Sequence, residues 1–458
     1  MILRNWPGSA TKMQLQLLEH LERRIPRYTS YPTAAQFGSD INGDAYEDWL
    51  AALPPDERAS IYIHIPFCTE LCLYCGCHTT VSRGYGAVAT YVDLLKREIS
   101  LIGQITGRRK INHIHWGGGT PTIVAPEDFL RVMAVLEARF SFTGQTELAI
   151  EIDPRTLTRE HITAFARAGI TRASLGVQDF EPRVQAAVRR IQSFDQTARA
   201  VDSLRDVGIE SINLDLMYGL PHQAVSTITA TAERALALQP DRIALFGYAH
   251  VPWMKRHQRL IAQSALPDGT ERFAQNRAAA DVFIAAGYQS IGLDHFAKNG
   301  DLLASRQREG RLHRNFQGYT TDESRTILGF GASAIGTLPP GYVQNAAGTL
   351  QYRDAIDRER PAITRGYLLT DEDRFRWYII ERLMCDLHVD LADVCRARGR
   401  SLADLAPEFR QLDELVAQGI VERGDGRIAV SSPPFIRTVC AVFDKHSFNG
   451  WPRYSLAS

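Results

Sequence analysis

The sequence has no excess of charge of either sign, since Lys and Arg total 52 and Asp and Glu also total 52. Such a chain does not attract nucleic acid or an anionic membrane over its whole surface, although it can carry a local basic pocket. No stretch approaches the apolar length of a membrane span. The N-terminus lacks the apolar segment followed by small residues that marks a signal peptide. We therefore expect a cytoplasmic protein with no membrane span and no nucleic-acid partner.

Cysteine is scarce, with seven in 458 residues, yet Cys68, Cys72, Cys75 and Cys77 stand within ten positions. The first three share the spacing of one helix face, but a buried core face does not explain the density, and Cys77 leaves that face. Disulfides are typical of secreted chains, and zinc usually takes two separated pairs of cysteines. Thiolates on one short loop also hold iron–sulfur clusters. The pattern favours a cluster over zinc, and zinc over a core.

The number of thiolate ligands decides the chemistry of such a cluster. Four thiolates occupy all four irons of a cubane cluster, whereas three leave one iron free to bind another ligand. Catalytic and structural metal sites differ in the same way, since catalytic sites keep one open position. The spacing of Cys68, Cys72 and Cys75 resembles the signature of the radical S-adenosylmethionine (SAM) enzymes. That resemblance implies that SAM binds the open iron and is split, by one electron, into a 5′-deoxyadenosyl radical. Spacing alone leaves the role of Cys77 open, and the family pattern implies that it is not a ligand.

Apolar or β-branched runs alternate with amphipathic stretches between residues 61 and 300. This alternation indicates right-handed βαβ units and a parallel sheet. The expected strands are 61–65, 111–116, 147–152, 172–177, 211–217 and 242–249. The expected helices are 88–104, 126–139, 158–168, 195–207 and 225–238. We therefore predict an α/β fold with a partial (βα)6 barrel of the radical SAM type.

Residues able to bind ligands follow the ends of these strands, where βα barrels keep their active sites. The cysteine loop follows the first strand, and Gly117–Thr122, whose glycines let backbone approach a ligand, follows the second. An ordinary tight turn explains that glycine run equally well. Each polar residue at the later strand ends is, taken alone, more often a satisfied interior group. Their recurrence at one end of the barrel favours a binding site; the later strand ends are Glu151–Pro154, Gly176–Asp179, Asn213–Asp215 and Tyr248–His250.

The C-terminal part of the chain has a different pattern. Helices followed by a hairpin at 419–430, with a Gly-Asp-Gly turn, indicate a smaller helical, winged-helix-like domain. A winged helix raises DNA binding as an alternative, but residues 371–445 hold more acidic than basic residues, the wrong sign for a phosphate partner. We divide the chain into four parts. These are an N-terminal extension over the active site (1–55), the barrel (56–300), substrate-side loops with a connection (301–369), and the C-terminal domain (370–458).

Beyond the cysteine loop, the chain resembles the oxygen-independent coproporphyrinogen III oxidase family over nearly its whole length. The first and last of the matching segments are not general radical SAM features. The segments are Arg27–Thr33, Tyr62–Phe67, Cys68–Cys77, His115–Thr122, Asp294–Ala297 and His313–Thr321. The resemblance implies the conversion of two propionate groups of coproporphyrinogen III into vinyl groups in haem biosynthesis, giving protoporphyrinogen IX and CO₂.

The resemblance also implies the site residues. A [4Fe–4S] cluster is held by Cys68, Cys72 and Cys75. One SAM molecule is bound by Tyr62, Gly118, Glu151 and Ile335. A second is bound by Tyr74, Gly119, Thr120, Gln178, Arg190, Asp215 and Ala249. Tyr74 departs from the family's Phe but keeps an aromatic face. Catalytic roles fall to Tyr62, Cys77 and Gln317.

The partners implied by the resemblance are coproporphyrinogen III, an electron donor and an electron acceptor, with a monomeric chain. Arg314, beside Gln317, is our hypothesis for a group that holds substrate propionates. Two other functions stay open. A haem-carrying chaperone of the same superfamily usually lacks the counterparts of Cys77 and of Arg27–Thr33, and both are present here. The second is a zinc-stabilised regulator with a winged helix. Metal analysis separates it from the enzyme, because the regulator would contain zinc and the enzyme iron.

Overall fold

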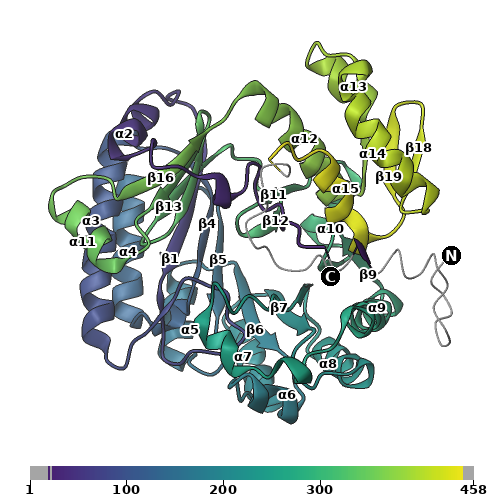
Figure 1. Ribbon diagram of the computed structural model, residues 1–458. Helices are drawn as coiled ribbons and strands as arrows, with labels where there is room; N and C mark the ends of the chain where they lie inside the picture. The colour runs from purple at the N-terminus through teal and green to yellow at the C-terminus, as the bar shows by residue number, and fades with distance from the viewer. Residues whose placement is uncertain (1–18, 21–22, 447–458) are drawn as a thin grey trace.

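The computed structural model describes residues 19–20 and 23–446 of the chain. A single twelve-stranded sheet runs through the molecule (Figure 1), and seven neighbouring strands in it are parallel. In sheet order they are β13 (Thr326–Phe330), β1 (Ala59–Ile65), β4 (Ile111–Gly118), β5 (Glu147–Ile152), β6 (Arg172–Gln178), β7 (Ser211–Tyr218) and β8 (Arg242–Gly247). The last six are the strands predicted from the sequence, so the predicted parallel sheet and partial barrel are confirmed.

The seventh parallel strand, β13, was not predicted, because it lies in a short glycine-containing segment. All five of its residues are buried. Gly329 allows the next strand to approach, since a Cβ there would lie 2.7 Å from the carbonyl oxygen of Ile335. Antiparallel strands extend both edges of the sheet: β14 (Ile335–Leu338), β15 (Gly341–Asn345) and β16 (Ile363–Leu368) beside β13, and β10 (His295–Lys298) and β9 (Tyr288–Ile291) beside β8. Much of the segment expected as loops is therefore strand.

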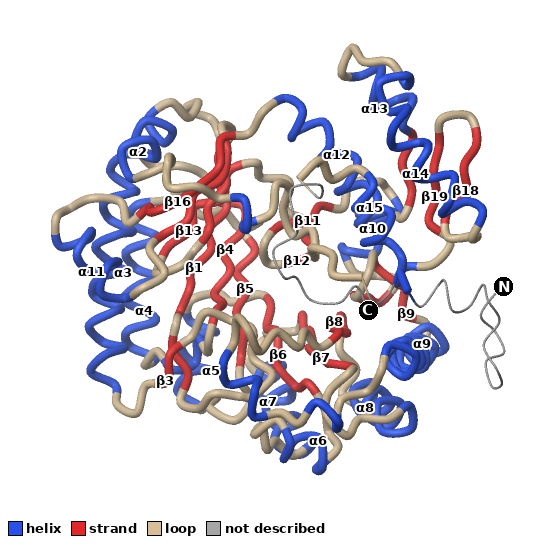
Figure 2. Tube along the Cα trace, viewed as in Figure 1, coloured by secondary structure: helices blue, strands red, loops and turns tan. Residues whose placement is uncertain are grey.

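Helices pack on the outer side of the sheet (Figure 2). The principal ones are α3 (Tyr85–Thr106), α4 (Pro126–Arg139), α5 (Arg159–Arg167), α7 (Phe194–Asp206), α8 (Val225–Ala237) and α9 (Gly269–Ala285). Shorter elements are α2 (Gly43–Ala51), α6 (Pro182–Ala187), α10 (Leu302–Arg308), α11 (Thr349–Asp357), and the strand pairs β2 (Phe67–Cys68) with β3 (Thr80–Val81) and β11 (His313–Asn315) with β12 (Gly318–Thr320). Four of the predicted helices agree with α4, α5, α7 and α8 to within one residue at each end, and α3 extends the fifth.

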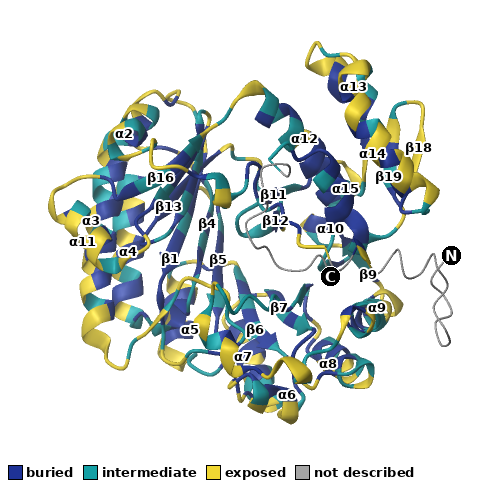
Figure 3. Ribbon diagram, viewed as in Figure 1, coloured by how far each residue is buried: buried dark blue, intermediate teal, exposed yellow. Residues whose placement is uncertain are grey.

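Alternation along the strands separates the core from the site. Successive side chains of a strand point to opposite faces of the sheet. On β4 the buried Trp116 faces outward onto Phe129 of α4, with ring centroids 4.8 Å apart. On the other face, His115 of β4 lies 3.0 Å from Glu151 of β5. The sheet thus buries an apolar outer face under the helices (Figure 3) and presents polar groups inside.

The C-terminal part carries a second hydrophobic core. Its helices are α12 (Asp371–Asp386), α13 (Leu391–Ala397), α14 (Ala406–Ala417) and α15 (Ile436–Val442), and its three-stranded sheet is β17 (His388–Asp390), β19 (Arg427–Val430) and β18 (Val421–Gly424). The predicted hairpin is confirmed, with Asp425 and Gly426 both at positive φ in its turn. Tyr28 and Tyr31 are buried in this core, so the N-terminal segment is anchored there. Among the described residues, no helix is long and apolar enough to cross a membrane.

Candidate active site

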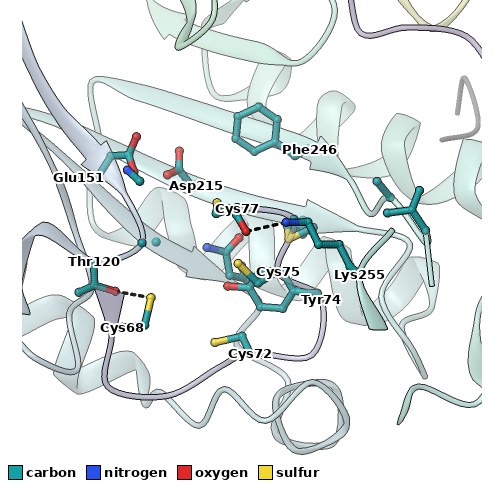
Figure 4. A pocket seen from close by; sticks show the side chains of 18 of the residues that line it. Cys68, Cys72, Tyr74, Cys75, Cys77, Thr120, Glu151, Asp215, Phe246 and Lys255 are labelled. Atoms are coloured by element: carbon teal, nitrogen blue, oxygen red, sulfur yellow. Dashed lines mark hydrogen bonds between the residues drawn. The ribbon is translucent and has the colours of Figure 1, made fainter. Parts of the chain in front are cut away.

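A cavity of about 840 Å³ opens where the parallel strands end. Its wall is formed by the cysteine loop after β1 and by the ends of β4 to β8. The residues predicted from the sequence that line it are Cys68, Cys72, Tyr74, Cys75, Cys77, Gly118, Gly119, Thr120, Glu151, Gln178, Arg190, Asp215 and Ala249. Figure 4 shows Cys68, Cys72 and Cys75 below the carboxylates of Glu151 and Asp215, with Cys77 between the two groups. The structure therefore brings together residues that are far apart in the sequence.

The thiols of the cysteine loop are already engaged by neighbouring donors. Thr79 and Thr120 donate hydroxyl hydrogen bonds to Sγ of Cys68, at 3.2 and 3.3 Å. A hydrogen bond from Cys77 lowers the pKa of the Cys75 thiol to about 7. At Cys68 burial outweighs the two hydroxyl donors and leaves the pKa of the thiol above its ordinary value. The donors themselves favour the thiolate, which is the form that binds metal.

The donor set fits a cluster better than a single ion. Among the described side chains, no three of His, Cys, Asp or Glu converge on one point as a lone zinc ion requires. Each thiolate of a cubane cluster binds a different iron, so its ligands need not converge. Three cysteine sulfurs on the rim of one cavity, each with polar neighbours, suit that arrangement.

A buried ion-pair network stands behind Cys72. Asp153 accepts from Arg155 at 2.7 Å and from Arg190 at 3.2 Å. Arg155 and Arg190 in turn lie 3.7 and 3.8 Å from Sγ of Cys72. Burial alone would raise the pKa of Asp153, but the hydrogen bonds from Arg155 and the charge of Arg190 leave it below its usual value. The carboxylate therefore stays ionised and fixes two guanidinium groups beside the thiol. The sequence analysis included Arg190 among the site residues and named Asp153 only within the strand-end segment Glu151–Pro154.

The glycine run at the end of β4 is a close-packed cradle rather than an ordinary turn. Gly118 has a φ of +115°, and a Cβ there would lie 2.8 Å from the ring of His64. A Cβ on Gly119 would lie 2.6 Å from the carbonyl oxygen of Phe67. Glu151 accepts from the backbone N–H of Gly118 at 3.3 Å. Glycine lets this backbone pack closely against β1 and the cysteine loop while it lines the cavity. Its N–H groups are used within the protein, since Gly118 donates to Glu151, Gly119 to the carbonyl of Ile65, and Thr120 to that of Phe67.

Asp215 forms a second acidic point on the cavity wall. It accepts from Ser174 at 3.0 Å and from Asn213 at 2.8 Å. Burial and the nearby charge of Glu151 raise the pKa of Asp215 to about 6. The carboxylates of Glu151 on β5 and Asp215 on β7, with β6 between them, therefore offer acceptors for hydroxyl groups such as those of a ribose.

Comparison with known proteins places the chain in a family. Residues 62–235 match the Radical SAM superfamily. The chain is 49% identical over 439 residues to a Bradyrhizobium diazoefficiens protein named oxygen-independent coproporphyrinogen III oxidase, which covers 95% of this chain and 98% of that one. A Paracoccus denitrificans protein of the same name is 41% identical, over 94% and 96% of the two chains. The solved Escherichia coli coproporphyrinogen III oxidase (HemN), described as a radical SAM enzyme, superposes with a TM-score of 0.88 at 35% identity, over 93% of this chain and 100% of that one.

This chain belongs to the oxygen-independent coproporphyrinogen III oxidase family. The membership that Arg27–Thr33 and the cysteine spacing predicted is thereby confirmed, together with the radical SAM class of enzyme. Members of this family use a [4Fe–4S] cluster and SAM, and the donors around the cavity are consistent with both.

Four residues predicted for the site do not line the cavity. Tyr62 lies behind the glycine run: its hydroxyl is 2.9 Å from Nδ1 of His64, and its ring stacks on His115. Ile335 begins β14, and Gln317 lies in the turn between β11 and β12. Arg314 is buried on β11, where it donates to the carbonyl of Tyr28. Roles for these four remain predictions, and for Tyr62 the structure indicates support of the cavity wall.

A segment after β8 fixes the cysteine loop in place, and sequence reasoning missed it. Lys255 donates to the carbonyl of Cys77, and His257 donates to that of Cys75, both at 2.8 Å. Gln258, fully buried, donates to the carbonyls of Tyr74 and Ala249, each at 3.1 Å. The basic, aromatic character of 253–259 was visible in the sequence, but a contact to a loop some 180 residues away was not.

We expect Gln258→Ala to loosen this loop and to shorten the half-life of the reconstituted cluster in the presence of a chelator by roughly tenfold, the cost usual for residues that hold metal ligands. Decay of the iron–sulfur absorbance measures it. Gln263→Ala, on an exposed turn nearby, is the control and should decay like the unaltered chain. Equal cluster half-lives in Gln258→Ala, Gln263→Ala and the unaltered chain would show that Gln258 does not fix the cysteine loop.

Proposed function

We propose that this chain converts two propionate side chains of coproporphyrinogen III into vinyl groups, as the names of its relatives indicate. The observation that carries the proposal is the meeting of three loop cysteines, a glycine cradle and two acidic strand ends on one cavity. In each conversion the substrate loses one hydrogen atom from the propionate β-carbon, one CO₂, and one electron to a one-electron acceptor. The radical that SAM supplies would take the hydrogen atom. The C–C bond to the carboxylate then breaks, one of its electrons pairs with the unpaired electron of the β-carbon to complete the vinyl double bond, and the electron left over as CO₂ departs is the one that the acceptor takes.

We propose that Cys68, Cys72 and Cys75 hold the cluster. When bound, the cluster and SAM supply a carbon radical strong enough to take an unactivated hydrogen atom. The chain itself orients the ligands and excludes water. Arg155 and Arg190 offset the negative charge that three thiolates bring into a buried site.

We propose two SAM positions on the cavity wall. Glu151 would serve the first, beside the backbone of the glycine cradle, and it is held there by His115 and Gly118. Asp215, with Ser174 and Asn213 fixing it, would serve the second beside Gln178 and Ala249. Cys77, exposed to the cavity, would act on substrate rather than on iron.

The test is anaerobic reconstitution with iron and sulfide, followed by SAM, a reductant and coproporphyrinogen III. We expect protoporphyrinogen IX and two CO₂ per substrate, with SAM consumed. Equilibrium dialysis with labelled SAM gives the stoichiometry, and two per chain is the expected value. Stoichiometric uptake of haem with no turnover would replace this proposal with the chaperone.

A further inference from the structure

A small chamber of about 30 Å³ opens beside the main cavity, under the C-terminal core. Arg27 and Gly247 line both spaces, so the chamber adjoins the substrate cavity. The other charged residues on its wall are Arg314, Arg437 and Asp294. The chamber is large enough for a few small polar atoms and not for a ring.

Positive charge is in excess around this chamber. Three guanidinium groups face one carboxylate, Asp294, and that carboxylate already accepts from His295 at 2.7 Å. Burial and the charge of Arg27 lower the pKa of Arg437 to about 9. A buried cation is costly unless nearby groups offset its charge. Arg437 already donates to the carbonyls of Pro26 and Ile25, so Arg27 and Arg314, rather than Arg437, are the candidate donors to an anion in this chamber.

Arg314 provides a separate indication of a ligand. Its side chain is only 6% exposed. Its Nε donates to the carbonyl of Tyr28 at 3.3 Å, and its guanidinium lies 4.3 Å from the centre of the Tyr319 ring. Its Nη1 atom is buried and has no hydrogen-bond partner among the described residues. Buried donors are nearly always satisfied, so an unpartnered one points to a missing acceptor.

The motif that contains Arg27 explains how the chamber is built. Tyr28 donates its hydroxyl to Asp444 at 3.1 Å, and the hydroxyl of Tyr31 accepts from the N–H of Lys445 at 3.0 Å. These tyrosines fix the backbone to the second core. Arg27 points the other way, reaching the carbonyl of Gly247 at 2.7 Å, and its accessible surface faces the cavity.

We propose that this chamber binds one propionate carboxylate of the tetrapyrrole, with Arg27 and Arg314 as its donors. The inference rests on the proposed function, because it takes the substrate from there. A planar carboxylate matches the forked guanidinium group and supplies the charge that is missing. The rest of the macrocycle would then extend into the main cavity.

The experiment measures the affinity of the reconstituted, oxygen-free protein for coproporphyrin III by fluorescence titration. We expect Arg27→Gln to raise the dissociation constant by roughly 10- to 100-fold, the effect of losing one charged hydrogen-bonding partner. Arg314→Lys, which keeps the charge and loses the fork, should raise it less. Arg396→Gln is the control, because Arg396 lies on α13, lines neither space, and has a side chain that is 76% exposed. Cluster absorbance and melting temperature show whether each variant is folded.

Two results would overturn the subsite. One is an unchanged affinity in folded Arg27→Gln, and the other is an equal loss in Arg396→Gln. If the unaltered chain turns over coproporphyrinogen III in either case, only the subsite fails. If it binds coproporphyrin III through Arg27 but does not turn over the porphyrinogen, the subsite stands and the proposed reaction fails.

Discussion

Serine in place of Cys68, Cys72 or Cys75 should each give a protein that no longer assembles a [4Fe–4S] cluster and no longer cleaves SAM. We expect turnover to fall by roughly a thousandfold or more in every one of the three, because groups that act as a unit lose their effect together. The physical reason is that a hydroxyl oxygen is a harder and weaker ligand for this iron than a thiolate. Iron and sulfide analysis after reconstitution, together with the release of 5′-deoxyadenosine, measures both losses.

Cys77→Ser is the matched control, since it changes the same atom on the same loop. Its thiol is exposed to the cavity and lies beside Cys75. If only three cysteines hold the cluster, this variant should bind the full complement of iron and still cleave SAM. Loss of iron in Cys77→Ser, or a full cluster in Cys72→Ser, would contradict the ligand assignment. If the unaltered chain contains zinc and no iron, the alternative function of a zinc-stabilised regulator would be favoured instead.

The sequence predicted those parts of the molecule that depend on local pattern. The six strands from β1 to β8 in the parallel sheet follow from the alternation of apolar runs and helices, and the cysteines of the site lie on ten consecutive positions. Strand ends gave Glu151 and Asp215 because parallel strands deliver their ends to the same edge. These signals are contained in short stretches of chain.

The parts of the fold and of the site that the sequence did not predict depend on contacts between distant segments. β13 is short and its Gly329 hides the strand pattern, so only its pairing with β1 reveals it. Gln258 reaches the cysteine loop through its side chain, and no spacing in the sequence encodes that contact. Asp153 was named only within the strand-end segment Glu151–Pro154, because its distant partner Arg190 reaches it only through the segment that follows α6. Long-range side-chain pairing is set by packing, which local pattern does not record.

Replacing Asp153 by Ala should be among the most destabilising single changes in this chain. The carboxylate and Arg190 are only 8% and 7% exposed, so the change leaves a buried guanidinium group with no anion. Removing one partner of such a pair typically costs about 3–5 kcal/mol of unfolding free energy. The matched control is Asp357→Ala, which breaks the pair with Arg97; both of its side chains are about half exposed. Exposed pairs are worth about 0–1 kcal/mol.

Thermal unfolding of the two variants without a cluster measures this difference, so that loss of iron does not enter the comparison. The pH dependence provides a second check. Because the pKa of Asp153 is lowered in the folded protein, the contribution of the pair is complete above the ordinary carboxyl pKa and is lost only as the pH falls through the lowered value. The deficit of Asp153→Ala should therefore be the same at pH 6 and at pH 8. A melting temperature close to that of Asp357→Ala would show that Arg155 and Arg190 are held without the carboxylate, and the network behind Cys72 would then need another explanation.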